Sequence, residues 1–396
     1  MATSTDADRR RAGTVEIAHA WADGDGRKPL DSLLGEYRDR TAGAHVTDTF
    51  YDDLSLSVKS RILAEDPPSI WVEWPGESLR PYEDVNALRD LTDVWTESNM
   101  ESGFLDGPRE LSQIEGAYRA IPINIHRINN LFYRTAAVER LGVDPSSVSN
   151  PREFLEVLEI CDEAGELGMA QPMKNPWTVL QLFSMILTGQ FGVDVYRSIT
   201  DGNPHEHRGA IETSIELLDA YADLASDDAT FVGMVGANRR FLDGESVFFH
   251  QGDWVGGEYA EVDGFEYRED WDHVPFPGTD GVYAMGMDAF VAARTIDDAT
   301  WDATREFLEF AGSPAGLRTF NRIKGAIPPR GDVSLDAYPD FLQDQYQDFQ
   351  ASREQVGSDA LETHPERFIE AKAAVASFVT HRDVSQAVGE FVEAYE

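Results

Sequence analysis

The sequence predicts an α/β protein with two lobes, each built on a doubly wound sheet, and three observations support this prediction. The chain has 396 residues, which is more than one compact core usually holds. Residues 14–74 alternate between strand and helix patterns, an order that gives a largely parallel sheet with helices on both faces. A hydrophobic content of 42% is sufficient to fill cores and excludes a disordered chain.

The alternation begins after a polar leader, residues 1–13, that we expect to be disordered. The segment TVEIAHAW (14–21) alternates β-branched and small residues, which predicts a buried strand. DGDGRKP (23–29) then predicts a turn, because glycine and proline interrupt regular structure. The remaining predicted elements of this part are a helix, a strand, a helix and a strand, over residues 30–41, 45–51, 54–66 and 69–74.

Residues 116–134 predict a short hairpin that runs into a strand. Apolar repeats with a helical period predict further helices over residues 151–167, 176–192, 210–226, 300–320 and 362–394. Strands are expected over 246–254 and, as a pair, over 281–294. Because no linker separates two βα regions, we expect the late strand MDAFVAAR to return to the first sheet. The expected lobes are then residues 14–124 with 287–330, and 125–286 with 331–396, and the ligand crevice is expected between them.

The charge balance is strongly acidic. Aspartate and glutamate number 72 against 33 basic residues, for a formal net charge of −39, and only five of the basic residues are lysines. Acidic, lysine-poor globular chains are typical of haloarchaea, because carboxylates hold water and cations at multimolar salt while screening weakens their mutual repulsion. Such a field repels nucleic acid and anionic lipid headgroups, so neither is expected as a partner.

Cofactor and metal motifs are missing from the sequence. The single cysteine, Cys161, excludes an intrachain disulfide, and its apolar helical surroundings predict a buried thiol. The sequence has no GxGxxG, P-loop, GxSxG or HExxH pattern, so we expect no cofactor, no metal site and no enzyme. No run of about 18 apolar residues predicts a membrane span.

Aromatic residues at strand ends are the first candidates for ligand contact. Trp21 lies at the carboxyl end of the first predicted strand, the end that faces a ligand in a parallel sheet. Trp74 ends the third strand, and Glu73 points to the opposite face. Asp253 and Trp254 follow a later strand and combine a hydrogen-bond acceptor with a ring on which the C–H face of a sugar can pack. Core packing for the tryptophans and helix capping for Asp253 are the competing explanations.

Two basic residues are further candidates. His126 lies in the segment NIHRIN, at an expected crossing between lobes, where a structural role is equally expected. Lys324, in NRIKGAIPPR, persists in a chain that has almost no lysine. An ammonium group can donate to neighbouring hydroxyls, and the alternative is an ordinary surface lysine.

Four stretches resemble the extracellular solute-binding proteins, family 1, of carbohydrate ABC importers, most of all the branch that binds glucose and mannose. These are AHAWADGDG, YRAIPINIHRINNLFYR, GDWVGGEY with VPFPGTDGVYAMGMDAF, and TFNRIKGAIPPRGDV. The resemblance covers nearly the whole chain after residue 13. It implies a periplasmic-binding-protein-like fold of type II, in which two lobes with doubly wound mixed sheets close by a hinge on a ligand in the cleft.

The resemblance also implies the residues that hold the sugar. Those that match the family's binding positions are Trp21, His126, Trp177, Asp253, Trp254, Asp288, Lys324 and His381. Four positions depart from the family. The family often has two adjacent tryptophans where this chain has Ala20 and Trp21, the nearest equivalent of one acid is Asp25, a family lysine falls at Glu73 or Trp74, and a family asparagine is Gly286 here. These departures leave open whether the sugar is glucose, another hexose, a pentose or a different small glycan.

The function implied is capture of a monosaccharide outside the cell and delivery to the membrane subunits of an ABC permease. We expect a monomer at the cell surface, held by a lipid anchor in the full-length precursor. Two alternatives remain at this point: a secreted glycoside hydrolase with an aromatic, acidic cleft, and a sugar-binding protein that serves chemosensing.

Overall fold

A computed structural model describes residues 13–22, 24–41 and 45–396. The chain forms two compact units: unit 1 comprises Met1–His126 with Met287–Gln343, and unit 2 comprises Arg127–Gly286 with Asp344–Glu396. Residues 331–343, expected in the second lobe, belong to unit 1, because Val333 packs in the core of that unit. In the described part of the chain, no helix has the length and hydropathy needed to cross a bilayer.

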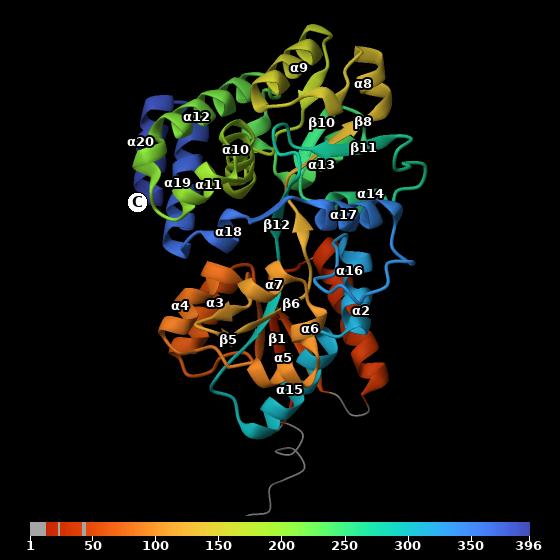
Figure 1. The fold of residues 1–396 in the computed structure, drawn as a ribbon, viewed down its shortest axis with the longest axis vertical. Helices are drawn as coiled ribbons and strands as arrows, with labels where there is room; N and C mark the ends of the chain where they lie inside the picture. The colour runs from red at the N-terminus through yellow and green to blue at the C-terminus, as the bar shows by residue number, and fades with distance from the viewer. Residues whose placement is uncertain (1–12, 23, 42–44) are drawn as a thin grey trace, which may run out of the picture. The chain divides into compact units, whose positions relative to one another are not determined.

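Unit 1 is built on a five-stranded mixed sheet with the order β2-β1-β3-β13-β6 (Figure 1). Its strands are β1 (Val15–His19), β2 (Val46–Phe50), β3 (Ile70–Glu73), β6 (Ala120–Pro122) and β13 (Ala289–Ala292). β1 pairs in parallel with β2 and with β3, as the alternation of strand and helix predicts. β13 inserts antiparallel between β3 and β6, which confirms that the late strand returns to the first sheet. A small hairpin, β4 (Gln113–Ile114) with β5 (Ala117–Tyr118), completes the strands of the unit.

Helices cover both faces of this sheet. One face packs against α2 (Gly24–Arg40), α5 (Thr92–Glu97), α15 (Asp298–Ala311) and α16 (Pro314–Lys324). The other packs against α3 (Leu54–Leu63), η1 (Gly76–Leu79) and α4 (Arg80–Asp84). Short helices α6 (Met100–Gly103) and α7 (Asp106–Leu111) lie between α5 and β4 in the chain. The two-residue period of β1 explains the division, since Val15 and Ile17 enter the first core and Ala18 enters the second.

The start of α2 differs from the sequence expectation. Residues 23–29 are predicted as a turn, but the helix begins at Gly24 and contains Pro29. Tertiary contacts override the local preference of glycine and proline here. Arg27 pairs with Asp48 of β2, Leu30 packs in the core of unit 1, and Gly26 lies directly against the ring of Trp21.

Unit 2 contains a four-stranded mixed sheet with the order β11-β8-β10-β9. Its strands are β8 (Asn130–Arg134), β9 (Leu167–Met169), β10 (Ser246–Gln251) and β11 (Trp271–Pro275). β10 pairs in parallel with β9 and antiparallel with β8. A second sheet has the order β14-β12-β7, from β14 (Glu354–Gly357), β12 (Val282–Gly286) and β7 (His126–Arg127), where the chain passes from one unit to the other.

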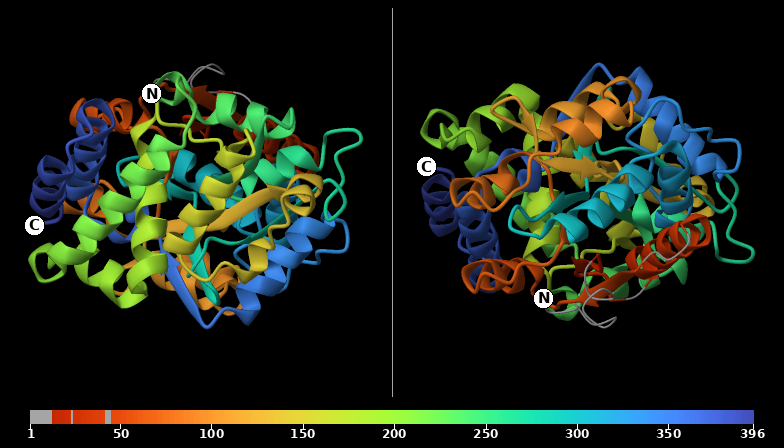
Figure 2. Two further views of the ribbon diagram at one scale, coloured as in Figure 1. Left: turned by 90° about the horizontal axis from the view of Figure 1, so that it is seen from above. Right: turned by 90° about the horizontal axis from the view of Figure 1, so that it is seen from below.

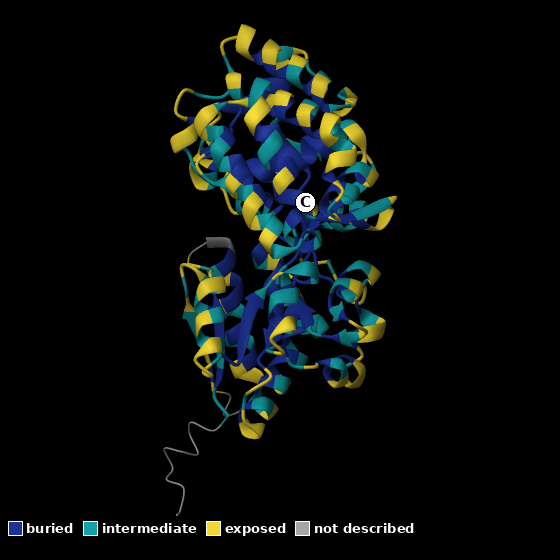
Figure 3. Cartoon of the chain, turned by 90° about the vertical axis from the view of Figure 1, so that its left-hand side faces the viewer, coloured by how far each residue is buried: buried dark blue, intermediate teal, exposed yellow. Residues whose placement is uncertain are grey.

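The helices of unit 2 pack around one large apolar core. The predicted helices are observed as α9 (Pro151–Glu163), α10 (Pro176–Phe191), α12 (Arg208–Asp223), α19 (Pro365–His381) and α20 (Val384–Tyr395). The remaining helices are α8 (Thr135–Leu141), η2 (Pro145–Ser147), α11 (Val193–Thr200), η3 (Pro204–His207), η4 (Ala229–Phe231), α13 (Met234–Leu242), α14 (Trp254–Tyr259), α17 (Asp340–Ala351), which begins in unit 1, and α18 (Asp359–Glu362). α19 and α20 lie side by side in both views of Figure 2. Figure 3 shows that exposed residues are concentrated on the outer helix faces of each unit, while most strand residues are buried and β2 and β11 are partly exposed.

Three tryptophans and the single cysteine, the latter as predicted, pack in the cores. Trp95 and Trp271 are fully buried, and Trp301 packs partly buried against the core of unit 1. Cys161 is buried in α9, and burial raises the pKa of its thiol to about 11, which keeps it protonated and unreactive.

Candidate functional site

In unit 1 the candidate residues gather at one edge of the five-stranded sheet. The carboxyl ends of β1 and β3 lie at this edge, followed by Trp21 and Trp74. Because β13 runs antiparallel to β3, with Ala289 opposite Glu73, Asp288 comes to the same edge from the other direction. The end of β6 joins them, since Pro122 is also paired with Ala289. The sheet therefore brings together side chains that are more than 260 residues apart in the sequence.

The indole ring of Trp21 is held by its surroundings. It is partly exposed and packs against Phe320 of α16, with ring centroids 5.7 Å apart, and against His19, with centroids 5.9 Å apart and planes inclined by 26°. A Cβ atom on Gly26 would lie 2.3 Å from the ring, so only glycine allows the indole to lie on the first turns of α2. An aromatic ring in a preset orientation suits the C–H face of a sugar, because no rotamer freedom is lost on binding.

A partly buried polar network lies next to Trp21. The backbone N–H of Trp21 donates to Nδ1 of His19 at 3.1 Å, and Nε2 of His19 lies 3.3 Å from Oδ2 of Asp48. Arg27 of α2 donates to the same carboxylate oxygen. Burial raises the pKa of Asp48, but the hydrogen bonds from Arg27 and His19 outweigh it and leave the pKa below its usual value.

Glu73 is the last residue of β3, and Trp74 follows it directly. The Trp74 side chain is 41% exposed, and its backbone N–H donates to Oε1 of Glu73 at 3.0 Å. Burial raises the pKa of Glu73 to about 7, and the charge of nearby Asp288 acts in the same direction. This carboxyl group can therefore either accept or donate a hydrogen bond near neutral pH.

Asp288 is oriented by Asn124, a residue that sequence reasoning did not single out. The Asn124 side chain donates to Oδ2 of Asp288 at 2.8 Å and accepts from the backbone N–H of Asp288 at 2.7 Å. The same amide nitrogen lies 3.3 Å from Nε2 of His126. The buried pair Asn124 and His126 thus supports the partly exposed carboxylate of Asp288.

The structure describes the side chain of Lys324 but not that of Asp25. Lys324 is the last residue of α16 and is only 5% exposed, so it is not a surface lysine. The helix ends there because Gly325 adopts a left-handed conformation, and the chain then pairs Ile327 with Ile125 beside the sheet edge. Asp25 lies in the first turn of α2, and its side chain falls outside the described residues.

Unit 2 carries a second aromatic surface. Trp177, near the start of α10, is 37% exposed, and its ring centroid lies 6.3 Å from that of Trp254, with planes inclined by 58°. Trp254 begins α14 just after β10, and a Cβ atom on Gly252 would lie 2.1 Å from its ring. Gln181, one turn after Trp177, donates to Gln251 at 3.4 Å and to the carbonyl of Ile128 at 3.2 Å. Two indoles and uncharged amides thus occur together at the end of β10.

The carboxylate of Asp253 is fully buried and binds backbone. Its Oδ2 accepts the N–H of Arg127 at 3.0 Å, and its own N–H donates to the carbonyl of Arg127 at 3.0 Å. It makes no side-chain cap to α14, so the capping explanation is wrong. This reciprocal pair ties the turn after β10 to β7.

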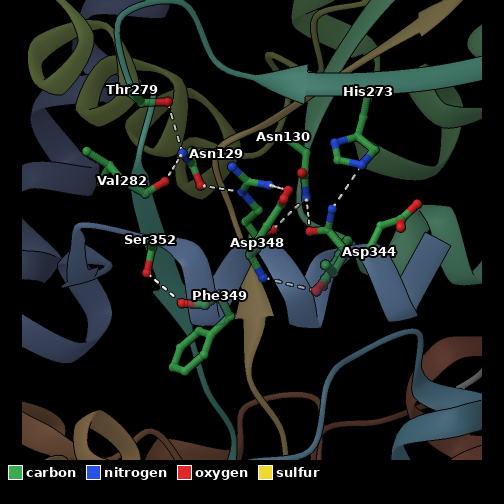
Figure 4. Close-up of polar contacts among 12 residues, drawn as sticks. Asn129, Asn130, His273, Thr279, Val282, Asp344, Asp348, Phe349 and Ser352 are labelled. Carbon is green, nitrogen blue, oxygen red and sulfur yellow. Dashed lines mark hydrogen bonds and ion pairs between the residues drawn. The ribbon is translucent and has the colours of Figure 1, made fainter. Parts of the chain in front are cut away.

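Asp253 binds the backbone of Arg127, and a separate polar network binds its side chain. Its guanidinium donates to Asn129 at 3.1 Å and to Asp348 of α17 at 2.6 Å. Figure 4 shows Asn129 bridging to Thr279 and Val282, and Asn130 and His273 facing α17. Burial, together with nearby arginines, lowers the pKa of His273 to about 3, so its ring stays neutral.

His381 is placed apart from these groups. It is the exposed last residue of α19, and the following Arg382 pairs with Asp219 and Asp223 around α12. No contact that the structure describes joins it to Trp177 or Trp254.

Sequence reasoning missed several residues that shape these surfaces: His19, Asn124, Arg127, Gln181 and Gln251. One signal was available, because each is a polar residue in or beside an apolar strand or helix and therefore needs a buried partner.

Solved structures of known proteins share this fold. A chitin oligosaccharide binding protein superposes with a TM-score of 0.84 over 96% of this chain and 98% of its own, at 16% identity. A maltose-bound MalE3 of T. maritima superposes with a TM-score of 0.77 over 96% and 99%, at 17% identity. The fold is thus of the periplasmic-binding-protein-like type, as predicted.

Residues 44–348 match the family described as bacterial extracellular solute-binding protein, and the chain belongs to this family. A xylose/arabinose-binding protein of Haloferax volcanii is 34% identical over 84% of this chain and 73% of its own length. An uncharacterized extracellular-binding protein of an ABC transporter from Pyrococcus horikoshii is 26% identical over 99% and 89%. Family membership confirms the prediction made from the four sequence stretches.

Proposed function

We propose that the protein captures a neutral monosaccharide, a pentose or a glucose-like hexose, and delivers it to an ABC permease without altering it. The observation that carries the proposal is the preset ring of Trp21 at the sheet edge where β1 and β3 end, the edge to which β13 also brings Asp288. A ring for the C–H face and carboxylates for the hydroxyls are the two kinds of group that a sugar needs. The xylose/arabinose-binding relative from Haloferax volcanii favours a pentose.

Titration calorimetry in molar KCl tests this proposal with a panel of xylose, arabinose, glucose, galactose, mannose, fructose and maltose. We expect saturable binding of at least one monosaccharide. Silence across the whole panel would overturn the proposal. Release of reducing sugar from polysaccharides by the pure protein would instead support a glycoside hydrolase.

The binding residues proposed belong to the sheet edge of unit 1 and to the region around the end of β10 in unit 2. In unit 1 they are Trp21, Glu73, Trp74, His126, Asp288 and Lys324, and in unit 2 they are Trp177, Asp253 and Trp254. Asp25 and His381 remain proposals from the family resemblance alone. Permease subunits as partner, a monomeric state and a lipid-anchored precursor are proposed on the same ground. Fractionation of cells tests the anchor, since a protein released without detergent would contradict it.

We further propose that the protein is adapted to high salt. The net charge of −39 repels itself in dilute buffer and is screened at molar ionic strength. Thermal unfolding measured from 0.1 M to 3 M KCl should show a steep gain in stability with salt. Full stability in dilute buffer would contradict the adaptation.

A further inference from the structure

The two neighbours of His19 allow the ring only one protonation state. The side chain is fully buried at the end of β1, on the same face of the strand as Ile17, which packs in one core with α2. The Trp21 amide at Nδ1 can only donate, and the Asp48 carboxylate at Nε2 can only accept. Both contacts are satisfied when the imidazole is neutral and carries its proton on Nε2.

Protonation of His19 breaks one of these contacts. An imidazolium has N–H groups on both nitrogens, so Nδ1–H would face the N–H of Trp21. The bond to Asp48 would persist and strengthen, because it becomes charge-assisted. The ring would then turn or move, and the backbone of Trp21, which lies only two residues away, would lose its anchor.

We propose that neutral His19 is the positioning residue that fixes Trp21 for sugar stacking, so that sugar capture weakens when His19 is protonated. This inference rests on the proposed function. Histidine at this position therefore makes one aromatic surface of the protein responsive to acid.

The charged groups around His19 determine the pH range in which its ring becomes protonated. They are Asp48 on β2 and Arg27 and Asp31 on α2, and the neighbouring rings of Trp21 and Phe50 are uncharged. Burial lowers the pKa of His19, and Arg27 acts in the same direction, whereas Asp48 and Asp31 raise it; the balance lies below the usual histidine value. Neutral His19 thus dominates at neutral pH, and the loss of affinity is expected only on acidification.

Two substitutions separate the two contacts. In His19→Asn the amide oxygen takes the place of Nδ1 and can still accept the Trp21 N–H, but it does not titrate. In His19→Gln the longer side chain reaches toward Asp48 and leaves the Trp21 amide without its acceptor. His205→Asn, at an exposed histidine of unit 2, is the control.

Sugar affinity is measured by calorimetry from pH 8 to pH 5 in molar KCl. We expect wild type and His205→Asn to bind steadily near neutral pH and to weaken in acid. His19→Asn should bind within about twofold of wild type at pH 8 with a flatter profile, and His19→Gln should bind about fivefold more weakly there, the loss of one hydrogen bond. An acid profile of His19→Asn identical to that of wild type, or full affinity of His19→Gln, would overturn the inference.

Nitrogen-15 spectra of the histidine-labelled protein test the protonation state without any sugar. The His19 signals, assigned by their loss in His19→Asn, should show a protonated Nε2 and an unprotonated Nδ1 at neutral pH. A proton on Nδ1 would refute the positioning role even if sugar binds. Absence of sugar binding in wild type, with the expected spectrum, would instead count against the proposed function alone.

Discussion

The rings of Trp21 in unit 1 and Trp254 in unit 2 both pack on a glycine, but different side chains bind the backbone next to them. Each ring lies on a glycine, Gly26 or Gly252, just beyond the end of a strand. The amide of Trp21 is bonded to an ionisable histidine. Near Trp254 the anchor is the buried carboxylate of Asp253 on the backbone of Arg127.

A preset ring can thus be accompanied by a histidine contact or by a carboxylate that binds the backbone of a distant segment. In both cases the glycine contact lowers the cost of ring order, because the ring has few orientations to lose. The histidine contact adds the response to pH inferred above. We therefore expect sugar contact on the aromatic surface of unit 1 to depend on pH.

The largest expected effect is on affinity, from removal of the Trp21 ring. Trp21→Ala should weaken sugar binding by about 2–3 kcal/mol, because the apolar area of the ring is no longer buried by the sugar. Calorimetry should then give a Kd about thirtyfold to 150-fold higher. Trp301→Ala is the control, since Trp301 packs against the core of the same unit under Arg89. Equal losses in the two variants would break the assignment of Trp21.

Asp253 should affect stability in unit 2. Asp253→Ala leaves the buried N–H of Arg127 without its side-chain acceptor, which should lower the free energy of unfolding by about 2 kcal/mol. Asp253→Asn retains an acceptor oxygen and should cost less. Urea unfolding in molar KCl measures both, and equal destabilisation would mean that the charge, rather than the hydrogen bond, matters.

Glu73 should make stability depend on pH. Its pKa of about 7 in the folded protein lies above that of an unfolded glutamate, so the folded state binds more protons between about pH 4.5 and 7. The contribution of Glu73 is fully present below this window and is lost as pH rises through it. Glu73→Gln should therefore be more stable than wild type at pH 8 by roughly 1.5 kcal/mol, with little gain at pH 4. An equal difference at both pH values would contradict a raised pKa, and Glu110→Gln, at an exposed position, is the control.

The smallest expected effects come from the glycines against which the two indole rings pack. Gly26→Ala and Gly252→Ala place a methyl group against the indole rings, which must shift, and each should weaken binding by about 1 kcal/mol. Gly35→Ala in α2 and Gly209→Ala in α12 are matched controls, because nothing lies within 4 Å of their added Cβ atoms. These controls should leave affinity unchanged and stabilise the helices slightly. Normal affinity in Gly26→Ala would show that the ring orientation is not preset by this contact.

Much of the candidate site could be anticipated from local pattern. Trp21 and Trp74 were predicted at strand ends, because a strand pattern with a two-residue period can be recognised from consecutive residues. Asn124 was missed because its significance depends on Asp288, a partner 164 residues away. The capping explanation for Asp253 failed for the same reason, since its partner Arg127 lies 126 residues away.

The sequence by itself determined the α/β class, the acidic surface and the tryptophans at the ends of the first and third strands. These properties follow from composition and from periodicities that span a few residues. Only the tertiary structure decided that α2 begins at Gly24, that β13 brings Asp288 to the edge beside β3, and that His19 meets Trp21 and Asp48 together. Such contacts depend on which distant segments pack against each other, and the local preferences of glycine, proline or histidine do not specify them.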